Sequence, residues 1–375
     1  EIYKMKKIIL CALAAIMAFS CATAQQKGNL NITGDITGME SGAAEIYLAS
    51  NFDKKADSVA VEKGKFILSC NIDKPIMVYL YIKDSTDDII YMTKIFTGAG
   101  DIIIKGEQGK DKTPYILNSP INDEAKEYEK YIKSLPEYKV SNKLSVEISE
   151  FFMVGDKIKI NELSAKKMEE TKKIIDSILS WKGNALTSQV AIYYVCEYAS
   201  SLSLEDQIAI SNKFPSEKKD SYYLNEFRKD LENEKKVAIG CVAPNFKVKD
   251  LAGKEYTMND FKGKYLFLEF SASWCGWCKK EIPFVRSAYT ALKDKNIVFV
   301  TMNMDDKREK WEKDVTKENI EWLCLSNLEG MKSKLAQSYN IHGIPACYVI
   351  DPNGVIIKRD IRGNEVLEYL SSLVR

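Results

Sequence analysis

A strongly apolar run that ends on two closely spaced cysteines sets the tightest limit on how this chain can fold. Residues 264–270 read KYLFLEF, which is typical of a strand covered on both faces, and residues 271–283 continue as SASWCGWCKKEIP. Residues 278–293 then fit a helix, and a second apolar strand is expected over residues 296–302. This alternation predicts a mixed sheet with helices on its faces. The cysteine pair therefore lies where a buried strand passes into a helix.

Three kinds of chemistry use a cysteine pair with this spacing: a zinc site, a structural disulfide and a redox-active dithiol. A structural zinc ion needs four ligands, usually from two such pairs. The chain has no second C-x-x-C motif and a single histidine, His342, so nothing supplies the other half of a metal site. A disulfide across two residues closes a very small loop and gives little entropic stabilisation. These considerations favour the dithiol.

The start of a helix is a suitable place for a reactive sulfur. The positive end of the helix dipole stabilises a thiolate there, so we expect Cys275 to be the exposed, attacking cysteine. Cys278, one turn into the helix, is expected to be covered and to resolve a mixed disulfide. Trp274 either packs over the site and shapes its contact surface or belongs to the core, and the sequence leaves both readings open.

The first residues have the pattern of an export signal. Met5 is followed by two lysines, an apolar run over residues 8–19 and the small-residue end SCATA. This pattern predicts a signal peptide over residues 1–24 and a periplasmic location in the cell envelope. The segment around Cys21 also resembles a lipobox, in which the cysteine is acylated and becomes a lipid anchor. We favour ordinary cleavage, and either route exports the protein.

The remaining chain divides into three parts. Residues 27–118 contain short alternating runs separated by Gly, Asn and Asp, which predicts a β-rich domain in the form of an antiparallel sandwich or barrel. Residues 119–236 carry apolar positions at helical spacing, and three or four helices are expected in this connecting region. Residues 238–375 hold the alternating strands and helices. The predicted fold class is therefore multidomain, with a β-rich, a helical and an α/β part.

Composition bears on the possible partners. The chain has 54 Lys and Arg residues against 53 Asp and Glu residues, a net charge of +1 at pH 7. This balance gives no electrostatic case for a nucleic-acid partner. Of the 9 cysteines, only the pair at 275 and 278 has a spacing with chemical meaning, and most of the others are expected to be buried thiols in the core.

Four short motifs follow one another in the α/β part. GCVAPNF at residues 240–246 precedes the strand, WCGWC spans residues 274–278, E-x-P follows at 281–283, and Gly-Ile-Pro at 343–345 precedes a later strand. In this combination the segment resembles the exported thiol–disulfide oxidoreductases of the TlpA/ResA type, which are AhpC/TSA-related members of the thioredoxin superfamily. The resemblance implies a thioredoxin fold. The β-rich part resembles the N-terminal domain found ahead of such domains in Bacteroidetes-type envelope proteins.

The resemblance also implies roles for single residues. Pro345 matches the cis-proline of the family, where the preceding backbone pairs with a substrate strand. Glu269 matches a buried carboxylate that accepts a proton in thioredoxins, and Glu281 matches the acid of the E-x-P motif. Because both neighbours of Glu269 are apolar, we expect this carboxyl to lie beneath the dithiol with a raised pKa. The dipeptide Gly276-Trp277 departs from the family, in which a proline commonly precedes the second cysteine, so the direction of electron flow stays open.

The leading functional hypothesis is a thiol–disulfide oxidoreductase that reduces disulfide-bearing exported proteins. It needs no bound cofactor, but reduction outside the cytoplasm implies a membrane electron-donor protein as partner. One alternative is a peroxidase with antioxidant activity, as in AhpC/TSA relatives, although residues 271–275 lack the Pro-Thr-x-x-Cys pattern of that chemistry. Another is a partner-binding envelope protein with a passive thioredoxin-like scaffold. The intact cysteine pair, both acids and Pro345 argue against a passive scaffold.

Overall fold

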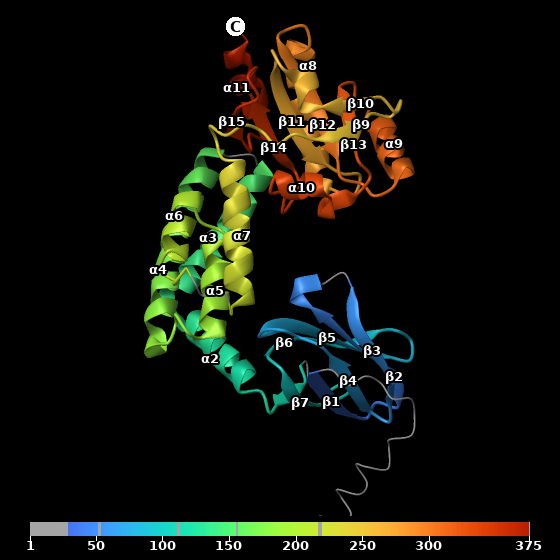
Figure 1. Ribbon diagram of the computed structural model, residues 1–375, viewed down its shortest axis with the longest axis vertical. Helices are drawn as coiled ribbons and strands as arrows, with labels where there is room; N and C mark the ends of the chain where they lie inside the picture. Colours follow the sequence, from blue (N-terminus) through green and yellow to red (C-terminus); the bar gives the residue numbers. More distant parts are fainter. Residues whose placement is uncertain (1–28, 52–53, 111–112, 155–156, 217–219, 375) are drawn as a thin grey trace, which may run out of the picture. The chain divides into compact units, whose positions relative to one another are not determined.

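The computed structural model describes residues 29–374, apart from 52–53, 111–112, 155–156 and 217–219. The proposed signal peptide over residues 1–24, with Cys21, lies outside the described residues. The described residues form two compact units, divided between residues 130 and 131 (Figure 1). Among the helices of the described part, none is both long and apolar enough to cross a membrane.

The first unit contains one continuous sheet of eight strands. Its order is β6-β5-β2-β3-β4-β1-β7-β8. The strands are β1 (Leu30–Thr37), β2 (Ser41–Leu48), β3 (Lys55–Glu62), β4 (Lys65–Cys70), β5 (Ile76–Asp84), β6 (Ile89–Thr97), β7 (Gly100–Glu107) and β8 (Tyr115–Leu117). In β1, buried residues alternate with more exposed ones, which is the period expected of a strand with one face on a core.

The β-rich character is confirmed, but the wholly antiparallel arrangement was wrong. Strand β1 pairs with β7 in parallel, with Leu30 opposite Gly100 and Thr37 opposite Glu107. Parallel strands need a long connection, and here the strands β2 to β6 lie between β1 and β7 in the sequence. Neither β6 nor β8 was predicted, although Tyr91 and Ile95 of β6 are buried in the core.

The helical segment is more divided than the sequence predicted. In place of three or four helices, the described residues between 119 and 236 form six: α2 (Pro120–Ser134), α3 (Pro136–Val154), α4 (Lys157–Ser180), α5 (Gln189–Ala199), α6 (Leu204–Ser211) and α7 (Tyr222–Lys236). Pro136 separates α2 from α3, because a proline disfavours helical geometry in the residue before it. Ser188, Ser203 and Ser221 each accept a hydrogen bond from a backbone N–H at the start of the next helix.

The α/β part is built on a seven-stranded mixed sheet in the order β10-β9-β13-β12-β11-β14-β15. Its strands are β9 (Lys247–Lys249), β10 (Glu255–Thr257), β11 (Tyr265–Ser271), β12 (Ile297–Asn303), β13 (Leu323–Ser326), β14 (Ala346–Ile350) and β15 (Ile356–Arg359), and its helices are α8 (Gly276–Leu292), α9 (Arg308–Lys317), α10 (Lys334–Ser338) and α11 (Glu365–Leu373). The central strands β11, β12 and β13 are parallel, whereas β14 is antiparallel to β11. This confirms the predicted thioredoxin-like fold.

Two apolar cores lie on opposite faces of this sheet. On one face, Phe267 and Phe299 pack with Ile282 and Val285 of α8 and Leu370 of α11. The other face, which carries Leu268 and Phe270, packs with α10 and with residues that precede β9. Because every strand residue of β11 from Leu266 to Ser271 is buried, a polar side chain on it must find partners inside the protein.

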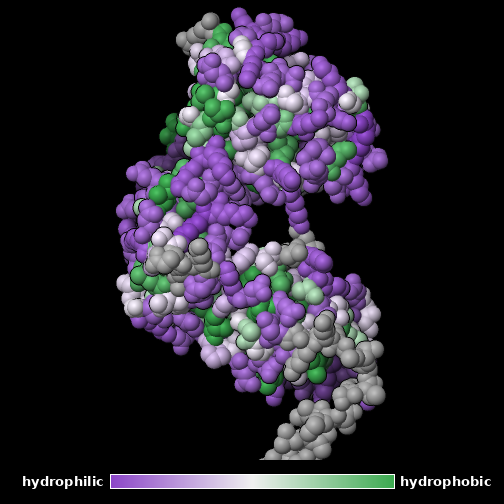
Figure 2. All heavy atoms as spheres, viewed as in Figure 1, coloured by the Kyte–Doolittle hydropathy of each residue, from purple (hydrophilic) through white to green (hydrophobic). Residues whose placement is uncertain are grey.

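The last helix of the helical segment is attached to the sheet. Glu234 of α7 forms an ion pair with Arg359 of β15 at 2.6 Å and accepts a hydrogen bond of 2.9 Å from the Asn340 side chain. Val237, which ends α7, is fully buried in the core on the same side as Phe270. Hydrophilic side chains cover most of the visible face of α7 and its neighbours (Figure 2). The helical segment and the α/β part therefore share a packed junction.

Candidate active site

The cysteine pair lies at the junction of β11 and α8. Cys275 is the residue that caps α8, and its Sγ accepts a hydrogen bond of 3.1 Å from the backbone N–H of Cys278. This N–H is one of the donors that a helix leaves unpaired at its first turn. Cys275 and Cys278 are joined by a disulfide, so the structure shows the oxidised form of the pair.

Cys275 is less accessible than the sequence predicted. Only 5% of its surface is exposed, compared with 1% for Cys278. The cause is the cis-proline loop, residues 341–345, which contains the cis peptide bond Ile344–Pro345. The carbonyl oxygen of Ile344 lies 3.6 Å from Cys275 Sγ and covers it. The first cysteine is thus the more accessible of the two, but by a small margin in the oxidised form.

Two tryptophans flank the covered pair. Trp274 is 59% exposed and Trp277 is 46% exposed, so neither is a core residue. The Lys280 ammonium lies over the Trp277 ring, 4.2 Å from its centroid. Large exposed aromatic side chains of this kind are typical of protein-contact surfaces. For Trp274, the structure selects the surface position over the core position.

Glu269 is a buried carboxyl in the middle of the sheet. It stands opposite Thr301 of β12 and Cys347 of β14, and is 5% exposed. Burial raises the pKa of Glu269 to about 7; the positive charges of Arg362 and Lys279 and a hydrogen bond with Thr301 counteract it, whereas Glu281 adds to it. A group with such a pKa can both take up and release a proton near neutral pH.

Glu281 faces the segment that follows β15. Its side chain is half-buried, and Oε2 accepts a hydrogen bond of 2.8 Å from the backbone N–H of Gly363. Its negative charge raises the pKa of Glu269. The two acids singled out in the sequence are therefore electrostatically linked.

Arg362 is a site residue that the sequence did not indicate. Its guanidinium donates hydrogen bonds to the carbonyl oxygen of Pro345 at 2.6 Å and to Cys347 Sγ at 3.2 Å. It also holds the pKa of Glu269 below the value that burial alone would give. Arg362 thus contacts the cis-proline loop and acts on the buried carboxyl. It follows the last strand, far from the C-x-x-C motif, and no spacing rule connects the two.

A second missed group is the ion pair of Lys279 with Asp314. The Lys279 ammonium lies 2.5 Å from both carboxylate oxygens of Asp314, a residue of α9 that is 9% exposed. Lys279 directly follows Cys278, and its charge lowers the pKa of Glu269. The dithiol helix is in this way fixed to α9 by a charged contact beside the second cysteine.

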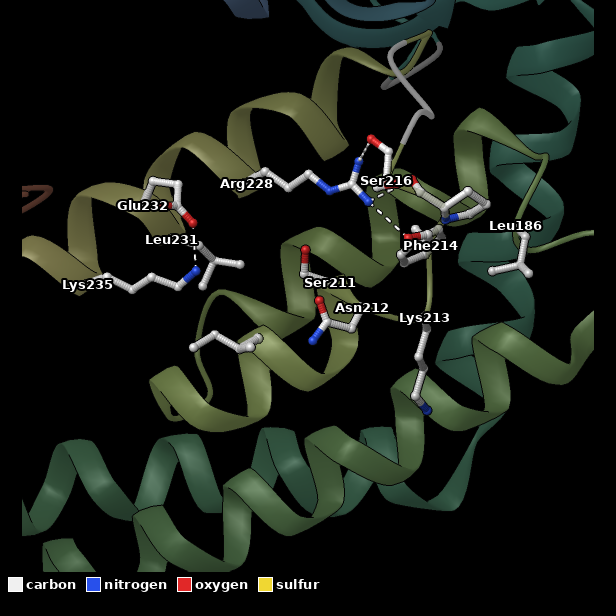
Figure 3. A pocket seen from close by; sticks show the side chains of 12 residues that line it. Leu186, Ser211, Asn212, Lys213, Phe214, Ser216, Arg228, Leu231, Glu232 and Lys235 are labelled. Atoms are coloured by element: carbon white, nitrogen blue, oxygen red, sulfur yellow. Dashed lines mark hydrogen bonds and ion pairs between the residues drawn. The ribbon is translucent and has the colours of Figure 1, made fainter.

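The described residues of the second unit form pockets in the helical segment and beside the cis-proline loop. The larger, about 930 Å³, belongs to the helical segment and contains Arg228, which donates hydrogen bonds to the carbonyl oxygens of Phe214, Pro215 and Ser216 (Figure 3). No cysteine and no buried acid is among the residues that line this pocket. The smaller, about 550 Å³, is bordered by Pro345 of the cis-proline loop. Within the described part of the chain, no cluster of His, Cys, Asp and Glu could hold a metal ion.

Comparison with known proteins assigns two segments. Residues 239–359 match the AhpC/TSA family, and residues 30–125 match a domain of unknown function, DUF4369. The thiol-disulfide oxidoreductase ResA of Bacillus thuringiensis subsp. konkukian (strain 97-27) is 30% identical over 142 residues, which cover 38% of this chain and 80% of the relative. ResA of Bacillus subtilis (strain 168) is 26% identical over 122 residues, covering 32% of this chain and 66% of the relative.

Solved structures include relatives of the same segment. The thioredoxin domain of a thiol-disulfide oxidoreductase from Bacteroides vulgatus is 32% identical; the match covers 37% of this chain and 99% of that chain, with a TM-score of 0.36. A thiol:disulfide interchange protein from Bacteroides sp. is also 32% identical, with 37% and 91% covered and a TM-score of 0.35. From the extent of the match to ResA and the cysteine pair beside a cis-proline, the chain belongs to the family of TlpA/ResA-like thiol-disulfide oxidoreductases.

Proposed function

We propose that this enzyme reduces disulfides of exported proteins through Cys275 and Cys278, and that it works on the periplasmic side of the cell envelope. The observation that supports this most directly is the hydrogen bond from the Cys278 N–H to Cys275 Sγ at the start of α8. A donor and a helix dipole directed at one sulfur stabilise its thiolate. The predicted signal peptide and the relation to ResA support the location.

The reaction starts from the reduced pair. The Cys275 thiolate attacks one sulfur of the substrate disulfide, which forms a mixed disulfide and releases the other substrate sulfur as a thiolate. Cys278 then loses its proton to the carboxylate of Glu269 and attacks Cys275 Sγ. The second substrate thiolate leaves, and the enzyme is left with the Cys275–Cys278 disulfide. Two electrons pass from the enzyme to the substrate.

The enzyme must be reduced again after each turnover. A membrane protein that relays electrons from the cytoplasm is the proposed donor, because its dithiol could reduce the Cys275–Cys278 disulfide by the same exchange in reverse. A measured reduction potential near that of thioredoxin, about −270 mV, would agree with a reductant. A value near that of DsbA, about −120 mV, would instead indicate an oxidase.

The test is a pair of single-cysteine variants in envelope extracts. Cys278→Ala should accumulate mixed disulfides with substrate proteins, because the attacking sulfur remains and the resolving sulfur is gone. Cys275→Ala should accumulate none. Equal trapping by both variants would contradict the assignment of roles. Consumption of hydrogen peroxide, measured on the same preparations, would reveal the peroxidase alternative if it matched the rate of disulfide reduction.

A further inference from the structure

The pocket beside the cis-proline loop has one wall that a thioredoxin-like domain alone would not supply. Gly343, Pro345 and Ala346 form its loop side, and α7 contributes Asp230 and Glu234. Its volume of about 550 Å³ falls within the range of ordinary ligand sites, about 300–1,000 Å³. The pocket is therefore large enough to receive side chains of a bound polypeptide.

This pocket and the dithiol share the cis-proline loop. Pro345 borders the pocket, and the carbonyl oxygen of the preceding Ile344 lies 3.6 Å from Cys275 Sγ. Because Ile344 covers Cys275 Sγ, we expect a polypeptide whose disulfide reaches this sulfur to contact the loop. Residues close in sequence to its reacting cysteine would then be near the pocket that the same loop borders.

The charges of the pocket are mostly negative. Three carboxylates, Asp230, Glu234 and Asp360, stand against one guanidinium, that of Arg359. Glu234 is already paired with Arg359, and Asp360 accepts a bond of 3.3 Å from Arg362. Asp230 forms no hydrogen bond or ion pair with any described residue; among nearby groups, His342, which also borders the pocket, and Lys229 lower its pKa, whereas Glu226 raises it. One acid therefore remains available for a cation.

The surroundings of Asp230 also favour a long basic side chain. Burial raises the pKa of Asp230, so its charged form would gain from a positive partner. Next to it the pocket has apolar walls from Leu202, Phe227 and Tyr348. Lysine and arginine combine an apolar stem with a charged head, and such a surface matches both parts.

We propose that this pocket binds a lysine or arginine side chain of the substrate polypeptide close in sequence to its disulfide, with Asp230 as the acceptor. The helical segment would then set substrate preference, while the α/β part carries out the exchange. This inference rests on the proposed function only in that the polypeptide is taken to be a disulfide substrate.

The test uses two synthetic peptides that each contain one disulfide and differ in one residue, arginine or glutamine, two positions from the reactive cysteine. With the full chain, kcat/KM should be about fivefold higher for the arginine peptide, the upper end of what an exposed ion pair contributes. Asp230→Asn should bring the ratio of the two values close to one. Glu232→Gln is the matched control: Glu232 also lies on α7, pairs with Lys235, does not border this pocket and is not among the charges that shift the pKa of Asp230, so the ratio should persist.

A charge reversal guards against a variant that merely damages the fold. Asp230→Lys should prefer a peptide with glutamate at the same position. Equal values for both peptides with the wild-type chain, or a ratio that Asp230→Asn leaves intact, would overturn the inference. A binding measurement by fluorescence, with peptides in which serine replaces cysteine, separates the pocket proposal from the proposed disulfide reduction. Preferred binding of the arginine peptide without any disulfide reduction would refute the proposed function and support the pocket.

Discussion

The guanidinium of Arg362 donates a hydrogen bond of 2.6 Å to the carbonyl oxygen of Pro345. Through this contact, the segment after the last strand holds the loop that covers Cys275. The same guanidinium lowers the pKa of the buried Glu269. Arg362 is thus a positioning residue that connects the substrate-facing loop with the group proposed to move the proton.

Replacement of Arg362 should have two separable effects. In Arg362→Met the loop loses its donor, so we expect kcat/KM for a peptide disulfide to fall by about tenfold. The pKa of Glu269 should rise as well, which would move the rising limb of the pH–rate profile to higher pH. Arg362→Lys keeps the positive charge but not the planar guanidinium. Its pH–rate profile should therefore be close to that of the wild type, while its kcat/KM should stay reduced.

Arg286 provides the control for this prediction. Its guanidinium also bonds two backbone carbonyls, those of Glu318 and Asn319, but it is not among the charges that shift the pKa of Glu269. Arg286→Met should therefore leave the pH–rate profile in place. A profile for Arg362→Met that superimposes on that of the wild type would show that Arg362 is only structural.

Glu269→Gln keeps the shape of the side chain and removes its titration. Because the pKa of Glu269 is raised to about 7, the wild-type rate should increase through neutral pH as the carboxylate forms. In the variant this limb should disappear, and the rate at pH 7 should fall by about 10- to 100-fold, the size of a general-base contribution. Glu368→Gln, an exposed residue of α11, is the control. An unchanged limb would exclude the proton relay.

The same substitution should make the fold less sensitive to pH. In the unfolded chain Glu269 ionises near its ordinary value of 4.5, whereas in the folded chain it stays neutral until about 7. The neutral carboxyl therefore contributes stability that is fully present below pH 4.5 and is lost as the pH rises through 7. Complete loss of this contribution lowers the free energy of unfolding by about 3 kcal/mol. Urea unfolding at pH 5 and pH 8 gives the free energy of unfolding of both proteins. Relative to the wild type, Glu269→Gln should be more stable at pH 8 than at pH 5. A stability difference that is the same at both pH values would contradict the buried, neutral carboxyl.

The pair of Lys279 with Asp314 should be energetically coupled. Because Asp314 is 9% exposed, Lys279→Met leaves a buried carboxylate without its partner and should lower the free energy of unfolding by about 3 kcal/mol. A double-mutant cycle with Asp314→Asn should recover most of this loss. The exposed pair of Lys166 with Glu162 serves for comparison and should give a smaller coupling that salt reduces further. Additive losses at Lys279 and Asp314 would show that the contact stabilises nothing.

Trp274 should matter for proteins more than for small disulfides. Its ring is 59% exposed, and the next residue, Cys275, is only 5% exposed, so we expect a folded substrate to contact the ring when its disulfide reaches Cys275. Trp274→Ala should lower kcat/KM for a protein disulfide by about tenfold, as for an interface hot spot, and have little effect on oxidised glutathione. Phe284→Ala, at an exposed aromatic residue farther along α8, is the control. Equal losses on both substrates would mean that Trp274 shapes the dithiol itself.

The local sequence pattern was sufficient to predict the strand and the helix on either side of the cysteine pair. The apolar runs that form β11 and β12 were located to within one residue at each end. Helix α8 begins two residues earlier than predicted, at Gly276, because Cys275 itself takes the place of a capping side chain. A burial argument also sufficed for Glu269, since a strand covered on both faces places a lone acid inside the protein.

Features that depend on distant contacts were not accessible in this way. Glu281 could equally have been a surface acid, because its partner is a backbone N–H of Gly363 that no sequence pattern identifies. Arg362 was missed for the same reason. The covering of Cys275 also arises from a distant segment, the cis-proline loop, whereas a helix N-terminus considered by itself indicates an exposed sulfur.

The ion pair of Glu234 with Arg359 has a practical consequence for anyone who shortens this protein. A fragment that starts at residue 238, close to where the AhpC/TSA match begins, would retain the dithiol and both acids of the site. It would also expose the Arg359 guanidinium, which is half-buried against Glu234, and open the core around Val237. Such a fragment would lack the helix that covers this side of the sheet. Its activity and selectivity should therefore not be taken for those of the whole chain.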